Sequence, residues 1–197
     1  MATYDVNFYD LDPFGVFSQT VNGTTVWGGP ADAEGTATIT DTQTGAQEFT
    51  LEDDDAGETA TATVTVGGNT STGVNVDAEE VWTLRDTVTG QEFQIVSFQG
   101  EGGAADGYYT LSEIPLVVGR TYETLEFATL PDSSAGDSVW DFNDYINPDG
   151  IVDGTGLAET IDGSYVDVDG DSIDGAVDNA DVVFAGGGAD RVESGLG

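Results

Sequence analysis

Residues 59–66, TATATVTV, decide the fold class of this chain. Threonine alternates there with a small apolar residue, so an extended backbone places Ala60, Ala62, Val64 and Val66 on one face. The threonines fall on the opposite face. The stretch is therefore predicted to be a β-strand with one buried face and one face that is solvated or paired with polar neighbours.

A β-hairpin is predicted further along the chain. Residues 80–86 (EVWTLRD) and 92–99 (EFQIVSFQ) both read as strands, and the connector between them contains Gly90, which tolerates a positive φ. Trp82 lies in the middle of the first of these strands, so we assign its ring to the core.

Similar short runs cover most of the first 147 residues, where β-branched and aromatic residues alternate with polar ones. No convincing amphipathic helix separates these runs. Further strands are predicted at residues 4–9, 24–28, 36–40, 48–51, 108–111 and 122–128. We therefore expect an all-β domain, an antiparallel β-sandwich of jelly-roll or immunoglobulin-like type.

The charge of the chain excludes several kinds of partner. Its 197 residues include 38 Asp plus Glu but only 3 Lys plus Arg, which gives a net charge of −35. So few cations exclude binding to nucleic acid backbones or to anionic membrane surfaces. No apolar run approaches membrane-spanning length, so no membrane insertion is expected. Such a charge implies a setting rich in salt or calcium.

The missing residue types limit the chemistry. The chain has no His and no Cys, so thiol nucleophiles, imidazole bases and the common zinc sites are excluded. Carboxylate pairs are the main catalytic option left, and among so many acids they will also occur by chance. We expect the protein not to be an enzyme.

The composition changes near residues 141–150, where we place a domain boundary. Residues 1–147 form the predicted β-sandwich domain, and residues 148–197 form an Asp/Gly-rich, calcium-binding segment. This segment holds 12 acids, ten of them Asp, and one Arg. Asp suits tight turns that fold around an ion.

Two stretches of this segment share a pattern. Residues 185–193 (AGGGADRVE) fit the nonapeptide Gly-Gly-x-Gly-x-Asp-x-(large apolar)-x except at the first position, and residues 154–163 are a degenerate copy. The pattern resembles the repeats-in-toxin, or hemolysin-type, calcium-binding repeats, which wind as a parallel β-roll. The resemblance implies calcium ligation by Asp190 and, second in line, by Glu159 and Asp162.

An acidic loop lies between the two copies. Residues 167–178 (DVDGDSIDGAVD) place carboxylates at positions 1, 3, 5 and 12 and so resemble the calcium loop of EF-hand-like proteins. Ser172 stands where that pattern has Gly, so we expect an irregular calcium loop continuous with the roll. The alternative is a solvated acidic linker. The predicted ligands are Asp167, Asp169, Asp171, Asp174 and Asp178.

A wider resemblance concerns residues 159–174 together with the acidic, β-rich region before them. This combination is similar to the front part of secreted proteins of marine alphaproteobacteria that carry such repeats and, further on, a Hedgehog/intein (Hint) domain. The N-terminus shows no signal peptide. The resemblance implies type I export and folding by Ca²⁺ outside the cell or at its surface.

We therefore expect an extracellular, calcium-binding protein with a structural or adhesive role and a capacity for self-association. The alternative is a calcium-dependent carbohydrate-binding module. In that case exposed aromatic rings stack on sugars, and the candidates are Trp27, Trp140, Tyr108 and Tyr109.

Two further acidic groups are weaker candidates for calcium. The triplet at residues 53–55 is either a calcium site at the edge of the sandwich or a solvated loop. The same two alternatives apply to Asp10 and Asp12. Arg85 and Arg120 are expected to make structural ion pairs among so many carboxylates.

Overall fold

The computed structural model describes residues 1–145, 151–154, 157–166, 172–173 and 182–193. The chain divides into two units, Met1–Tyr145 and Ile146–Gly197. The described residues of both units contain strands but no α-helix. Their helical segments are the 3₁₀ turns η1 (Pro13–Gly15), η2 (Gly45–Phe49) and η3 (Asp54–Ala56). None of these segments has the length and hydropathy needed to cross a membrane.

The first unit is built on one large antiparallel sheet. Its main path runs, in spatial order, through β1 (Ala2–Phe8), β3 (Gly35–Asp41), β5 (Thr61–Val66), β6 (Asn69–Asp86), β7 (Glu92–Glu101) and β8 (Gly107–Ser112). The remaining strands are β9 (Thr121–Thr129), which joins β6 to β2 (Thr24–Val26), and a separate small pair, β4 (Thr50–Leu51) with β10 (Trp140–Asp141).

The alternating strand and the hairpin are confirmed. All four apolar residues of the TATATVTV stretch are buried, and β6 pairs with β7 in antiparallel register from Asn75↔Glu101 to Arg85↔Glu92. Gly90 in the connector has φ +78°. Trp82 is buried in the core, as assigned.

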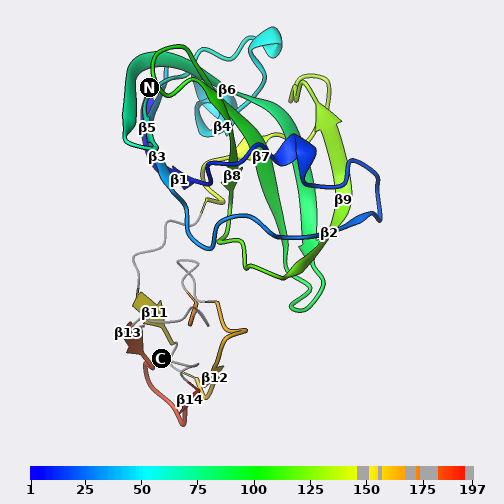
Figure 1. The fold of residues 1–197 in the computed structure, drawn as a ribbon, viewed down its shortest axis with the longest axis vertical. Coiled ribbons are helices and arrows are strands. Elements are labelled where there is room, and N and C mark those ends of the chain that lie inside the picture. The colour runs from blue at the N-terminus through cyan, green and yellow to red at the C-terminus, as the bar shows by residue number, and fades with distance from the viewer. Residues whose placement is uncertain (146–150, 155–156, 167–171, 174–181, 194–197) are drawn as a thin grey trace. The chain divides into compact units, whose positions relative to one another are not determined.

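The central strand β6 is much longer than predicted and changes partner along one edge. Residues 69–75 of β6 pair with β5, residues 80–86 pair with β9, and β7 lies along the opposite edge (Figure 1). The register of β6 against β7 shifts between Ala78 and Glu80. Of the predicted strand at residues 48–51, the first two residues belong to η2 and the last two form β4.

The sheet curls until its two ends meet. Tyr9, just after β1, forms a bridge with Thr110 of β8, and each backbone N–H donates to the other's carbonyl at 2.9 and 3.1 Å. A core of apolar side chains fills the curl. This arrangement is consistent with the predicted antiparallel sandwich.

Two of the tryptophans named as candidates for sugar stacking belong to the core. Trp27 and Trp140 are both 0% exposed. The Trp27 ring packs against Tyr9 and Phe17, and its indole N–H donates to the carbonyl of Pro30 at 3.0 Å.

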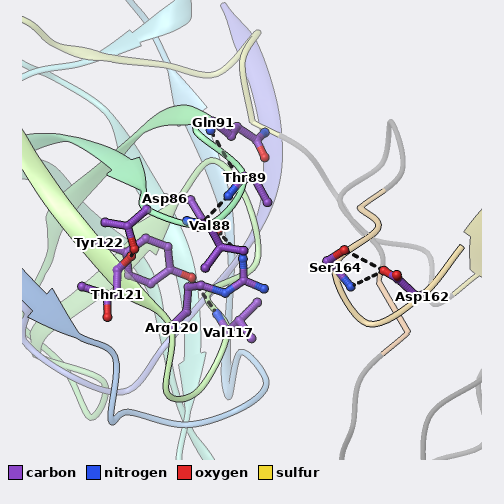
Figure 2. Close-up of polar contacts among 11 residues, drawn as sticks. Asp86, Val88, Thr89, Gln91, Val117, Arg120, Thr121, Tyr122, Asp162 and Ser164 are labelled. Carbon is purple, nitrogen blue, oxygen red and sulfur yellow. Dashed lines mark hydrogen bonds and ion pairs between the residues drawn. The ribbon is translucent and has the colours of Figure 1, made fainter. Parts of the chain in front are cut away.

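A buried ion pair holds the β6–β7 connector against the segment before β9. Arg120 donates to Asp86 at 2.8 Å, and both side chains are mostly buried (Figure 2). The other oxygen of Asp86 accepts hydrogen bonds from the backbone N–H groups of Val88 and Thr89. The expected structural ion pair of Arg120 is thus present, and Arg85 pairs with Glu92 and Glu123.

Replacing Arg120 with Met is expected to lower the free energy of unfolding by about 2 kcal/mol, because it leaves Asp86 buried without its cation. The backbone N–H groups of Val88 and Thr89 still donate to Asp86 in this variant, so the loss of unfolding free energy is smaller than for a charge with no partner at all. Urea denaturation of Arg120→Met beside Arg191→Met, an exposed arginine, measures the difference. Equal stability of the two variants would show that this pair contributes nothing.

The second unit contains two pairs of parallel strands. β11 (Ile151–Asp153) pairs with β13 (Val182–Phe184), and β12 (Thr160–Ile161) pairs with β14 (Arg191–Val192). Both pairs join residues 31 positions apart, since 182 − 151 = 31 and 191 − 160 = 31. The two nonapeptide-like copies have the same separation, 185 − 154 = 31. Val152, Ile161 and Ile173 form a small buried cluster in this unit.

Candidate metal centre

Three carboxylates converge in the first unit. One ligand oxygen from each of Asp53, Asp54 and Asp77 lies within 4.8 Å of the other two. In the part of the chain that the structure describes, no other set of three acidic side chains comes this close together. We call this set the carboxylate centre.

The loop after β4 supplies two of the three residues. Asp53 caps the 3₁₀ turn η3, where its Oδ1 accepts a hydrogen bond from the backbone N–H of Asp55 at 2.8 Å. The backbone N–H of Asp53 donates to the carbonyl of Pro131, and Gly57 ends the turn with φ +102°. Asp54 is exposed, whereas Asp53 is buried.

The third residue comes from the central strand. Asp77 lies between Val76 and Ala78, whose side chains belong to the core, so strand alternation directs Asp77 to the opposite face. The backbone N–H of Ala78 donates to the carbonyl of Glu52 at 2.9 Å and fastens the loop to the edge of β6 next to Asp77. Asp77 is consequently only 2% exposed.

Asp77 lacks the partners that a buried carboxylate normally has. Neither of its oxygens has a hydrogen-bond partner of normal geometry. Burial, followed by the negative charges of Glu79, Asp54 and Asp53, raises the pKa of Asp77 to about 8, and the backbone N–H of Asp54 offsets only part of this rise. Burial also raises the pKa of Asp53.

No arginine compensates the centre. The ion pairs of Arg85, Arg120 and Arg191 are made with other acids, and the chain has no other cationic side chain. The charge of the carboxylate centre therefore has to be balanced by bound protons or by a cation from solution.

Two buried glutamates near the centre, Glu52 and Glu58, differ from Asp77 because hydrogen bonds satisfy their carboxylates. Glu58 accepts hydrogen bonds from the backbone N–H groups of Glu52, Thr59 and Ala60 at 2.7 to 3.1 Å. Glu52 accepts one from the hydroxyl of Ser133 at 2.7 Å. Both glutamates fasten the loop. Asp77 has no such bonds of normal geometry, which distinguishes it from the two glutamates.

The arrangement suits a hard divalent cation. Calcium takes six to eight oxygen ligands at about 2.3–2.6 Å, so any two of its ligands are separated by no more than about 5 Å. Three carboxylates in this range supply part of such a shell, and backbone carbonyls or water supply the rest. Sequence reasoning found the loop half of the centre but missed Asp77, which lies 77 − 53 = 24 residues from Asp53.

Most of the ligands predicted in the second unit lie outside the described residues. These are Asp167, Asp169, Asp171, Asp174 and Asp178. Asp162 is described: its carboxylate accepts from the backbone N–H and the hydroxyl of Ser164 at 2.9 and 2.6 Å (Figure 2), and these bonds lower its pKa.

The structure brings Asp190 and Glu159 together. They hold equivalent positions in the two copies, and Asp190 Oδ1 accepts a hydrogen bond from the backbone N–H of Glu159 at 3.1 Å. The backbone N–H of Arg191 donates to the carbonyl of Glu159 at 2.9 Å. The aspartate position of one copy thus contacts the corresponding position of the other.

A glycine permits this close approach of the two copies. Gly188 has φ +136°, and a Cβ there would collide with the carbonyl of Leu157. Gly188→Ala is therefore expected to separate the copies and to raise hydrogen exchange at the backbone N–H groups of Arg191 and Glu193 at least tenfold. Gly163→Ala, which has room for a Cβ, is the matched control. Unchanged exchange in Gly188→Ala would contradict this packing.

The aromatic residues proposed to stack on sugars are mostly unavailable. Trp27, Trp140 and Tyr109 are buried, and the Tyr109 hydroxyl donates to the carbonyl of Ala105 at 3.2 Å. Only Tyr108 among the four is substantially exposed, at 45%. Burial therefore rules out Trp27, Trp140 and Tyr109 as exposed rings for sugar stacking and leaves Tyr108 as a candidate.

Comparisons with known proteins add no relative. No family model, curated protein or solved structure matches the chain. The case for any function therefore depends on the side chains themselves.

Proposed function

We propose that this protein is an extracellular calcium-binding protein with a structural or adhesive role, in which Ca²⁺ holds each unit in its folded form. The observation that carries the proposal is Asp77, a buried carboxylate without a hydrogen-bond partner of normal geometry, whose ligand oxygen lies within 4.8 Å of those of Asp53 and Asp54. Leaving such a charge unpaired costs several kcal/mol, and a bound cation removes this cost.

Calcium fits the centre better than magnesium does. Magnesium demands a nearly ideal octahedron and keeps most of its water, whereas calcium accepts irregular sets of carboxylates and carbonyls. The centre combines a loop turn with a strand residue, which makes an irregular set. The net charge of −35 further favours binding of divalent cations over the whole surface.

The second unit supports the same function by a different route. Its described strands pair in parallel at one constant offset of 31 residues, and parallel strands are the element that a β-roll stacks. A roll folded by calcium would form only where calcium is plentiful, which agrees with a protein that is exported before it folds. We propose that Asp190 and the acids of residues 167–178 hold calcium between such turns.

Calorimetric titration of CaCl₂ into the chelator-stripped full chain tests the proposal. We expect saturable binding, weaker binding of Mg²⁺, and a higher melting temperature with calcium. Asp53→Asn combined with Asp54→Asn should remove one class of sites, whereas Asp190→Asn should leave that class intact. Absence of both heat and stabilisation would overturn the proposal.

A further inference from the structure

A second acidic site lies beside the carboxylate centre but has a different composition. It is an open pocket of about 170 Å³. The turn η1, with its preceding residue, and the strands β6, β7 and β8 contribute its lining, which consists of Asp12, Phe14, Glu79, Glu80, Ser97 and Tyr108. None of these residues belongs to the carboxylate centre.

Two aromatic residues, Phe14 and Tyr108, line the pocket beside its mainly polar residues. Phe14 and Tyr108 are each 45% exposed, so both rings retain surface for a ligand. Hydrogen bonds hold both residues in place: the backbone N–H of Phe14 donates to Asp12 at 2.9 Å, and the Tyr108 hydroxyl accepts from the Gln99 side chain at 3.2 Å. These bonds fix the backbone of Phe14 and the hydroxyl of Tyr108.

The polar lining is anionic and lacks a compensating charge. Asp12, Glu79 and Glu80 form none of the ion pairs found among the described residues. Ser97 is fully buried, and its hydroxyl makes no hydrogen bond of normal geometry. Burial raises the pKa of Glu80 to about 7, and the nearby Ser97 hydroxyl offsets only part of the rise. The pocket therefore favours a positively charged occupant.

A metal ion does not fit this geometry. The carboxylates of Asp12, Glu79 and Glu80 are not among the described acids whose oxygens converge within 4.8 Å. A neutral sugar would have to displace water from three carboxylates without neutralising any of them. A larger cation whose charged nitrogen is surrounded by methyl groups avoids both difficulties. Its methyl groups can contact the faces of aromatic rings while its charge is balanced by carboxylates that lie apart from one another.

The geometry points to a binding site for a small quaternary ammonium compound in this pocket, with Phe14 and Tyr108 against its methyl groups and the three carboxylates around its charge. This inference goes beyond the calcium-binding function and does not depend on it. The ligand chemistry is shared by free trimethylammonium compounds and by choline headgroups of lipids. The phosphate of such a headgroup is repelled by the net charge of −35, so we assign the pocket to the free compound.

The test is a titration of choline into the calcium-saturated protein, followed by NMR chemical shifts of the pocket residues. Its neutral carbon analogue, 3,3-dimethylbutan-1-ol, has the same shape without the charge. We expect saturable shifts with choline, at least tenfold weaker binding of the analogue, and little binding to phosphatidylcholine vesicles. Equal binding of choline and the analogue, or no binding of choline, would overturn the inference.

Two variants locate the binding. Tyr108→Ala removes one ring, and Glu80→Gln removes one charge at nearly constant shape. Each is expected to weaken choline binding roughly fivefold to twentyfold. Phe49→Ala, which removes a partly exposed ring outside the pocket, should bind choline as the parent does. Unchanged affinity in Tyr108→Ala would exclude this pocket. Calcium is saturating in every titration. A loss of choline binding would therefore count against the pocket and not against calcium binding at the carboxylate centre.

Discussion

Asp77→Asn is expected to stabilise the protein in a calcium chelator and to abolish its stabilisation by calcium. The substitution keeps the shape of the side chain but removes a buried charge that has no partner. The free energy of unfolding should rise by about 2 kcal/mol at pH 8. The rise is limited to this size because the buried amide still lacks hydrogen-bond partners. This corresponds to a rise of roughly 4–8 °C in melting temperature.

Calcium should reverse the order of the two proteins. At a calcium concentration about 100 times the dissociation constant, the parent gains about 2.7 kcal/mol and the variant gains nothing from this centre. Asp106→Asn, which changes an exposed aspartate outside the centre, serves as the control and should respond to calcium as the parent does. Calcium stabilisation of Asp77→Asn equal to that of the parent would exclude Asp77 as a ligand.

The stability of the calcium-free protein should fall steeply as the pH rises from about 5 to 9. The pKa of Asp77 is about 8 in the folded protein against 3.8 without the fold, so the folded state binds the proton more tightly. Its contribution to stability is complete below pH 3.8 and is lost as the pH rises through about 8. Glu113, whose pKa burial raises to about 7, acts in the same direction.

Melting temperatures in about 1 M NaCl, where salt screens the general repulsion among surface acids, isolate this effect. Each proton involved contributes up to about 1.4 kcal/mol per pH unit, so the decline should exceed 10 °C over the range. Calcium, or the substitution Asp77→Asn, should remove the part of the pH-dependent decline that Asp77 causes. Glu113→Gln should remove only the part that Glu113 causes. A flat profile without calcium would show that Asp77 is not a strained carboxylate.

Local patterns in the sequence predicted much of the sheet. The alternation at residues 59–66 and the Gly-containing connector of the hairpin are properties of a few neighbouring residues, and both predicted structures are present. The length of β6 was not predictable in this way. Its two halves pair with strands from different parts of the chain, and such pairing depends on the topology of the whole sheet.

The candidate site shows the same limit. The triplet at residues 53–55 was visible as a cluster of acids, but an isolated Asp at position 77 carries no local signal. Its importance comes from the loop that covers it. Local alternation also left the burial of Trp27 and Trp140 undecided, since Trp27 follows the three-residue strand β2 and Trp140 begins the two-residue strand β10.

The most direct test of the calcium proposal is an anomalous difference map from crystals grown with calcium. The account predicts a peak of calcium between the carboxylates of Asp53, Asp54 and Asp77, with oxygens at about 2.3–2.6 Å. An empty centre at saturating calcium, with Asp77 protonated and hydrogen-bonded to a neighbouring carboxylate, would contradict it.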